Sequence, residues 1–244
     1  MKTCSSIILA CLMTAGAERA AAADLGGLPP ARIAEPEEVY TPALRWTGLY
    51  LGANAGYSFG RDGTRETSAI PYNGMNFEHF GSHAQGFTGG GQVGYNYQSG
   101  RVVLGIEADF NYANLTRSAT SPSGAVTAGG TGGFVGSVRP RLGLAWGQWL
   151  LYGTGGVAFG TADSTTTGNT GNTFAASNSD WRVGWVAGMG VEYAFNRNWS
   201  VRTELLHTNL GATTVSGVAL DGNAYSWRDH ITENAVRFGV NYRF

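Results

Sequence analysis

The last nine residues of the sequence read Val236-Arg237-Phe238-Gly239-Val240-Asn241-Tyr242-Arg243-Phe244. Large apolar side chains occupy every second position of this stretch, and Arg237, Asn241 and Arg243 lie between them. Successive side chains of a β-strand point to opposite sides of the sheet. The stretch therefore predicts a strand with one apolar face and one polar face.

Seven further segments show the same alternation. They are 49–59, 87–97, 102–112, 134–144, 149–159, 181–193 and 199–205. In segment 149–159 both parities are apolar, so the direction in which its side chains face is left open. Strands of about ten residues with one apolar face are typical of transmembrane β-barrels, in which that face contacts lipid.

The connections between these segments alternate in length. Short turns are predicted at 98–101, 146–148 and 196–198, and long polar connections at 60–85, 114–130, 161–180 and 211–230. Bacterial outer-membrane barrels have short periplasmic turns and longer extracellular loops. The predicted fold is therefore all-β: an eight-stranded antiparallel transmembrane β-barrel over residues 46–244, with short periplasmic turns and four long extracellular loops.

The positions of the charged residues agree with this assignment. Every ionisable carboxyl or guanidinium group within the segments has the parity opposite to the large apolar residues. A charge that faces lipid at the bilayer midplane costs about 2–4 kcal/mol, which explains the exclusion. A soluble sandwich would also hide one apolar face. Aromatic residues near the short turns favour the membrane, because they match an interfacial girdle; these are Trp46, Trp146, Trp149, Trp199, Tyr242 and Phe244.

The inward-facing charges are predicted to form an ionic network that fills the lumen. An eight-stranded barrel is just wide enough to be filled by its own side chains, and buried charges persist only when they are paired and hydrogen-bonded. The residues expected in this network are Glu107, Asp109, Arg139, Arg141, Glu192, Arg202, Glu204 and Arg237. The alternative reading of the same residues is a small porin-like channel.

The N-terminus has the pattern of a secretory signal. Lys2 precedes a short apolar stretch, and the small residues Ala21-Ala22-Ala23 end it, so 1–23 is predicted to be removed on export. Residues 24–45 hold four prolines and are expected to form a flexible periplasmic leader. Both cysteines lie within 1–23, so the exported chain would have no thiol.

The composition argues against a typical soluble domain and against a nucleic-acid-binding protein. Charged residues make up 14% of the chain, and glycine accounts for 38 of 244 residues. Typical soluble domains have about 25% charged residues. Without residues 1–23 the chain keeps 14 basic and 16 acidic side chains, counted from the sequence. This balance predicts no nucleic-acid partner.

The sequence gives little support for catalysis. No His-x-Ser pair occurs, and no nucleophile, base and orienting group can be assigned, so we expect no enzymatic activity and no metal or cofactor. An envelope lipid enzyme is the weakest of the open alternatives. Connection 60–85 carries Tyr72, Phe77, His79 and Phe80, which would permit binding of a flat hydrophobic ligand such as haem, or adhesion to another surface.

Three stretches resemble a known family. They are Ala22-Ala23-Asp24-Leu25, Trp46-Thr47-Gly48-Leu49-Tyr50-Leu51-Gly52 and the closing residues 236–244. They are similar to those of small outer-membrane β-barrel proteins of alphaproteobacterial type, which are related to opacity proteins and to the OmpA-type membrane domain.

The resemblance implies a location in the outer membrane, with outer-membrane lipid as the surroundings. It also implies that the barrel-assembly machinery reads the last strand through Phe238, Val240, Tyr242 and Phe244. The function expected from the whole sequence is a structural, surface-exposed role in the envelope. A small channel, or loop-mediated binding of a host or environmental ligand, is left as the alternative.

Overall fold

The computed structural model describes residues 44–72, 77, 79–168 and 175–244. The predicted signal segment 1–23 lies outside the described residues, as does the predicted leader except for its last two positions. Both therefore stay predictions. No helix in the described part of the chain is long and apolar enough to cross a membrane.

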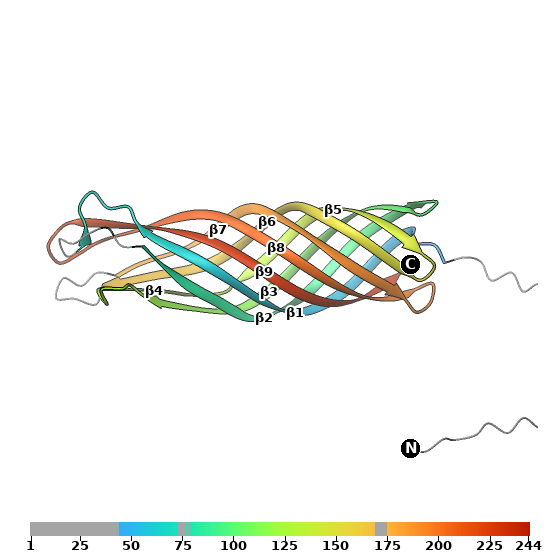
Figure 1. Cartoon of the computed structure of the whole chain (residues 1–244), viewed down its shortest axis with the longest axis horizontal. Helices are drawn as coiled ribbons and strands as arrows, with labels where there is room; N and C mark the ends of the chain where they lie inside the picture. Colours follow the sequence, from blue (N-terminus) through green and yellow to red (C-terminus); the bar gives the residue numbers. More distant parts are fainter. Residues whose placement is uncertain (1–43, 73–76, 78, 169–174) are drawn as a thin grey trace, which may run out of the picture. The chain divides into compact units, whose positions relative to one another are not determined.

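Nine antiparallel strands make up the described part of the chain (Figure 1). Their bounds are β1 Gly48–Glu66, β2 His79–Ser99, β3 Val102–Thr120, β4 Val126–Thr131, β5 Phe134–Trp146, β6 Trp149–Gly168, β7 Ala175–Ala194, β8 Trp199–Val218 and β9 Ala224–Arg243. The sheet closes on itself because β1 pairs with β2 on one side and with β9 on the other. The all-β antiparallel ring predicted from the alternation is confirmed.

The strand count differs from the predicted eight. β4 and β5 both pair with β3 and with β6, so they follow one another at a single place in the ring. Gly132 and Gly133 separate them, although the backbone of both glycines still hydrogen-bonds to β3. β4 lies inside the predicted connection 114–130, where glycine and threonine give no apolar alternation. The sequence reading therefore missed this strand.

Most strands are about twice as long as predicted, because they extend further at one end of the ring. We call this the loop end, and the end with the short turns at 100–101, 147–148 and 195–198 the turn end. The predicted connections 60–85, 114–130, 161–180 and 211–230 were largely wrong, because the strands continue through most of them. Among the described residues, the segments outside the strands at the loop end are 67–72, 121–125 and 219–223.

The apolar side chains change faces along several strands, which explains the error. In β9, Val236, Phe238 and Val240 face outward, whereas Tyr225 and Trp227 of the same unbroken strand face inward. In β3 the same change occurs between outward Phe110 and inward Leu115. Apolar groups on the outer face suit an apolar surrounding, and apolar groups that fill the interior suit an outer face in water. The alternation then reverses its phase while the hydrogen-bonded ladder continues.

The facing of β6, which the sequence left open, follows from burial. Trp149, Leu151 and Val157 are exposed on the outer face, whereas Leu150 and Tyr152 are buried inside. The inward side of this strand therefore adds bulky side chains to the lumen near the turn end.

Candidate functional site

The eight residues of the predicted network all face the interior and are almost completely buried. β3 supplies Glu107 and Asp109, and β5 supplies Arg139 and Arg141. β7 carries Glu192, β8 carries Arg202 and Glu204, and β9 carries Arg237. Each position is fixed by the two-residue period of its strand, which turns these side chains inward. We call this set the lumen network.

Glu107 lies at the centre of the lumen network. Its Oε1 accepts a hydrogen bond from Arg139 Nη2 at 2.7 Å, and its Oε2 accepts one from Arg202 Nη1. Arg141 Nη1 lies 3.5 Å from Oε2, and the Tyr50 hydroxyl donates to the same oxygen at 2.6 Å. Three guanidinium groups and one phenol thus surround a single carboxylate. This density of donors compensates the loss of hydration that burial imposes on the charge.

Asp109 joins β3 to the neighbouring strand β5 and to β9 across the lumen. Its Oδ1 accepts from Arg237 Nη1 at 3.1 Å, and its Oδ2 lies 3.2 Å from Arg139 Nη2. The Ser137 hydroxyl donates a hydrogen bond to Oδ2 as well. β3 and β9 are not neighbours in the ring, so the pair formed by Asp109 and Arg237 crosses the lumen.

Glu192 anchors the part of the network nearest the turn end. Its Oε2 accepts from Arg141 Nη2 at 2.9 Å, while its Oε1 accepts from the Ser200 hydroxyl at 2.6 Å and from Asn241 Nδ2 at 2.9 Å. Arg141 therefore bridges Glu192 and Glu107. The contact links β5 to β7, two strands that are not adjacent.

Glu204 completes the set. Its Oε2 lies 3.2 Å from Arg202 Nη2 and 3.7 Å from Arg139 Nη2, and its Oε1 accepts from the Tyr152 hydroxyl at 2.8 Å. The network contains four carboxylates and four guanidinium groups, counted over its eight members. Because these charges balance, the lumen network itself carries no net charge.

Sequence reasoning missed the two tyrosines of the network. Tyr50 lies opposite Gly94, and Tyr152 lies opposite Gly190, in the register of neighbouring strands. A methyl group at either glycine would overlap the tyrosine hydroxyl, so each glycine makes room for a ring that lies against the wall. The Arg141 guanidinium stacks 3.8 Å from the centre of the Tyr152 ring, a cation–π contact. The sequence did contain a signal for Tyr50: it lies between the outward-facing Leu49 and Leu51, so the alternation places its ring on the inner face, where no aromatic residue was expected.

Apolar layers lie on both sides of the lumen network. Toward the turn end, Trp46, Leu150 and Ala194 belong to one buried cluster. Toward the loop end, two clusters follow, one around Leu206 and Ile231 and one formed by Ala113, Leu115 and Val135. A last cluster lies beyond them; it contains Tyr72, Phe80, Ala125, Val126, Ala128, Val215, Ala219, Tyr225 and Trp227. The interior is thus filled in layers along the axis.

Two aromatic predictions need correction. Trp46 was expected in the outer girdle, but it is buried inside the turn end, with the Arg243 guanidinium 4.9 Å from its ring. It lies before β1 begins, where the alternation no longer fixes a side. Tyr72 and Phe80 were candidates for a ligand-binding loop, but both are buried in the cluster at the loop end, whereas Phe77 and His79 are exposed.

The histidines do not form a metal site in the described part of the chain, where no group of three or more potential ligands is placed to hold an ion. His79 and His83 lie in β2, and two residues of the same parity in a strand are on the same outer face. His207 Nδ1 lies 2.8 Å from Asn234 Oδ1.

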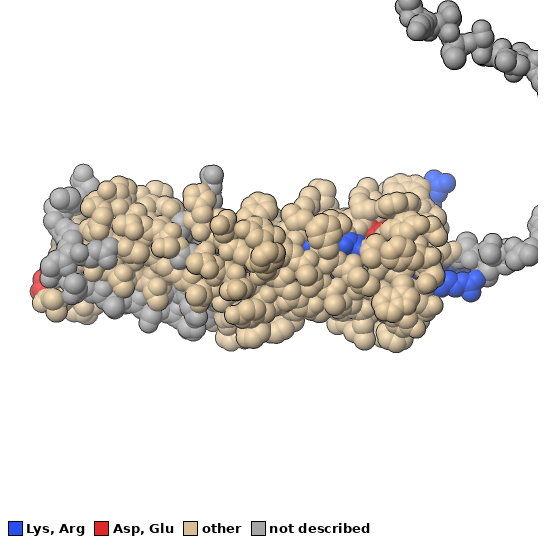
Figure 2. Space-filling model, turned by 90° about the horizontal axis from the view of Figure 1, so that it is seen from below, with Lys and Arg blue, Asp and Glu red and all other residues tan. Residues whose placement is uncertain are grey.

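The outer face near the turn end is apolar. Phe238, Val240 and Phe244, three of the four predicted assembly-signal residues, are exposed on it, and Tyr242 lies on the same face, half-buried against Trp199. Figure 2 shows that one side of the barrel is nearly free of charged residues between its ends, apart from a small group of charged atoms visible through the wall. Such a surface is stable only in an apolar surrounding.

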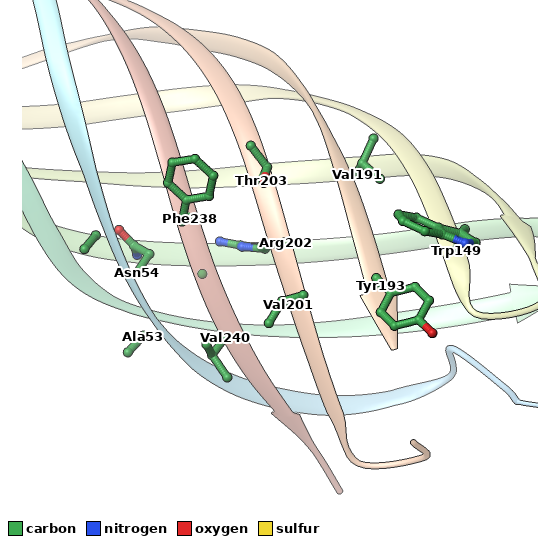
Figure 3. A pocket seen from close by; sticks show the side chains of 12 residues that line it. Ala53, Asn54, Trp149, Val191, Tyr193, Val201, Arg202, Thr203, Phe238 and Val240 are labelled. Atoms are coloured by element: carbon green, nitrogen blue, oxygen red, sulfur yellow. The ribbon is translucent and has the colours of Figure 1, made fainter. Parts of the chain in front are cut away.

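A shallow groove of about 700 Å³ lies on this face, lined mainly by apolar residues of β1, β7, β8 and β9 (Figure 3). Asn54 and Arg202 reach it from the inner side of the wall. Arg202 passes over Gly239, where a Cβ would approach its Nε to 3.1 Å. The groove therefore presents an apolar surface suited to acyl chains, with the lumen network directly beneath a thin wall.

Comparison with known proteins agrees with this architecture. The family model described as outer membrane protein beta-barrel domain matches residues 7–244. The chain belongs to this family.

Members with similar sequences are outer-membrane proteins by name. The 31 kDa outer-membrane immunogenic protein of Brucella melitensis is 34% identical over 98% of this chain and 99% of its own length. The 22 kDa outer membrane protein of Rhizobium leguminosarum is 32% identical over 83% of this chain and 80% of its own. The outer membrane protein OprG of Pseudomonas aeruginosa aligns in structure with a TM-score of 0.47 and 15% identity, covering 81% of this chain and 96% of OprG.

The predicted family resemblance and the outer-membrane location are thereby confirmed. The protein is an outer-membrane β-barrel protein, and its outer face near the turn end is apolar. The lumen network and the buried clusters form its interior.

Proposed function

We propose that this protein is a closed, non-catalytic barrel with a structural and surface-exposed role in the outer membrane. In this arrangement β4 and β5 act together as one wall strand, which gives the ring eight positions. The turn end lies in the periplasm, and the loop end extends beyond the outer leaflet, as in other barrels with short periplasmic turns.

The observation that carries this proposal is the filling of the interior. Four carboxylates are matched by four guanidinium groups in the lumen network, and buried apolar clusters lie on either side of it. Arg139 is 0% exposed and Trp227 at the loop end is 0% exposed, so neither side chain is accessible from the solvent. A hydrated path for ions would require several layers to open together.

The extension of the strands beyond the apolar belt supports surface exposure. The outward side chains there are mostly Thr, Ser, Asn, Arg and His, which suit contact with water and sugars. The Brucella relative is named an immunogenic outer-membrane protein, which fits exposure of the same region.

Conductance of the refolded chain in planar bilayers tests the closed lumen. We expect no reproducible current steps at moderate voltage, under conditions in which a known porin conducts. A heat-modifiable gel shift on the same sample shows that the barrel has folded. Regular steps from folded protein would overturn the closed lumen and favour the small channel.

A further inference from the structure

Basic side chains gather on one outer side of the loop end. On the outward parity of β1, β2 and β9, beyond the apolar belt, the exposed residues include two arginines and three histidines. They are Arg65, His79, His83, Arg228 and His230, which we call the basic patch. No ion pair between these five residues and an acidic side chain occurs within the described part of the chain.

The strand register places like charges directly opposite one another. Arg65 of β1 pairs with Arg228 of β9 on one side and with His79 of β2 on the other. Directly opposed residues have Cβ atoms about 4.5–5.5 Å apart, and like charges at such positions are destabilising. An anion held between the two guanidinium groups would remove this repulsion.

Glycines leave space beside this row of charges. Gly63 pairs with Gly81 of β2 and with His230 of β9, two residues from the row of Arg65. Among the described side chains, His79 is the one that a Cβ at Gly63 would meet, with its Cε1 at 3.9 Å. The strand surface is therefore open at Gly63, with nitrogen donors around it. This is the geometry that an anionic group needs in order to approach a backbone closely.

No basic side chain occurs among the described outward residues on the opposite side of the loop end. The described outward side chains of β3, β4 and β6 at comparable positions are mainly threonine, serine and asparagine, among them Asn114, Thr116, Thr127, Thr165 and Thr167. Hydration alone would be served as well by these uncharged residues. The asymmetry therefore indicates a ligand that is negatively charged and lies on one side of the barrel.

The height of the basic patch identifies the surroundings it meets. The first polar outward residues after the belt are Gln85 in β2 and Asn234 in β9, and the patch lies two to six residues beyond them. A strand advances about 3.3 Å per residue and is tilted about 40° in a barrel, so the patch spans roughly 5–15 Å above the apolar belt. With the loop end outside, this is the headgroup region of the outer leaflet.

We propose that the basic patch binds the phosphate groups of outer-leaflet glycolipids. Arginine forks bind phosphate in a bidentate way, and an imidazole donates a hydrogen bond to it in either protonation state. The binding site rests on the orientation proposed above but not on the closed lumen, because a conducting barrel would carry the same patch.

Native mass spectrometry of the chain refolded in detergent tests the site. The probe is a deep-rough lipopolysaccharide, with lipid A and phosphorylated inner-core sugars. We expect Arg65→Gln combined with Arg228→Gln to weaken its binding about tenfold. The matched control is Arg101→Gln with Arg197→Gln, which removes the same charge from exposed positions at the turn end and should leave binding unchanged. The gel shift checks that both variants fold.

Three results would overturn the proposal. One is equal binding by the patch variant and the unchanged chain, and another is an equal loss in both variants. The third is binding that survives enzymatic dephosphorylation of the lipopolysaccharide. A soluble sulfated polysaccharide serves as a competitor: if it binds the patch more tightly than the glycolipid does, the ligand is a free polyanion rather than lipid. Because the assay is performed in detergent, failure here leaves the conductance result untouched.

Discussion

Arg139 shows how a single residue holds the interior together. Its guanidinium is fully buried, and Nη2 lies within 3.7 Å of the carboxylates of Glu107, Asp109 and Glu204. Removing it would leave these carboxylates short of compensating charge in a medium of low polarity. Breaking a buried ion pair by removing one partner costs about 3–5 kcal/mol.

We therefore expect Arg139→Met to lower the free energy of unfolding by about 3–5 kcal/mol. Urea titration of the refolded protein in phosphatidylcholine vesicles, followed by tryptophan fluorescence, measures the change. Arg101→Met, at an exposed position in the turn between β2 and β3, is the control and should stay within about 0.5 kcal/mol. Equal midpoints and slopes for the two variants would contradict the role assigned to Arg139.

The sequence correctly predicted whether a side chain faces the lumen or the outside of the barrel wherever its polarity alone decides this. Charged residues such as Glu107 and Arg202 had to face inward, because lipid excludes them. Tyr50 and Tyr152 were missed because a tyrosine is stable on either face: its ring suits lipid, and its hydroxyl suits a buried carboxylate. Only the glycine opposite each ring decides the side, and that glycine is identified by register, which one strand's sequence does not contain.

At the scale of the strand, β9 shows what the sequence contains and what it hides. Its half next to the C-terminus shows a clear apolar stripe, so its position and facing were predictable. Its other half places Tyr225, Trp227 and Ile231 inward, and the outward positions are polar. The same period of two persists with the opposite phase. A prediction based on one apolar stripe therefore places the end of the strand at the point where the outward residues become polar.

The continuation of the strands predicts slow amide exchange outside the membrane. We expect backbone amides of 60–65 and 226–233 to be protected nearly as well as those of 236–242, because all belong to the same ladder between β1 and β9. Hydrogen–deuterium exchange with mass spectrometry of the refolded protein measures this. Segment 219–223, which leaves the ladder, is the internal reference for rapid exchange. If the amides of 60–65 exchanged as rapidly as that reference, the continued ladder would be contradicted, and the long connection predicted from the sequence would be supported.

The outward stripe of β9 also carries a prediction about assembly. Deleting Phe244 removes an exposed aromatic residue whose ring packs against Tyr242 at 5.0 Å between centroids, and whose amide donates to the Leu49 carbonyl where β1 meets β9. We expect slower assembly in cells, measured by the fraction of heat-modifiable protein in outer membranes. Phe195→Ala is the control, because Phe195 is equally aromatic and exposed but lies after β7, away from the closing strand. Equal assembly of both variants would count against a special role for the last strand.

At the scale of the whole molecule, the proposed closed barrel has an interior that would act as a series of barriers to ions. Ions would have to pass the cluster with Trp46, the lumen network, the middle clusters and the cluster with Trp227 in turn. The resistances of barriers in series add, so any one closed layer is enough to block current. Stability and ion conductance should therefore respond differently to substitution. A variant with a disrupted lumen network is expected to have a lower free energy of unfolding but still to conduct no ions.

Single-channel recording distinguishes this series from a single gate. We expect Trp46→Ala alone and Trp227→Ala alone to remain non-conducting, because each leaves the other layers intact. Arg139→Met should behave in the same way, although it is less stable. Conduction is expected only when substitutions in several layers are combined, and its size should rise with each further layer removed. If Trp227→Ala alone gave steady steps from folded protein, the other layers would have to be permeable, and the interior would be a channel with one gate at the loop end.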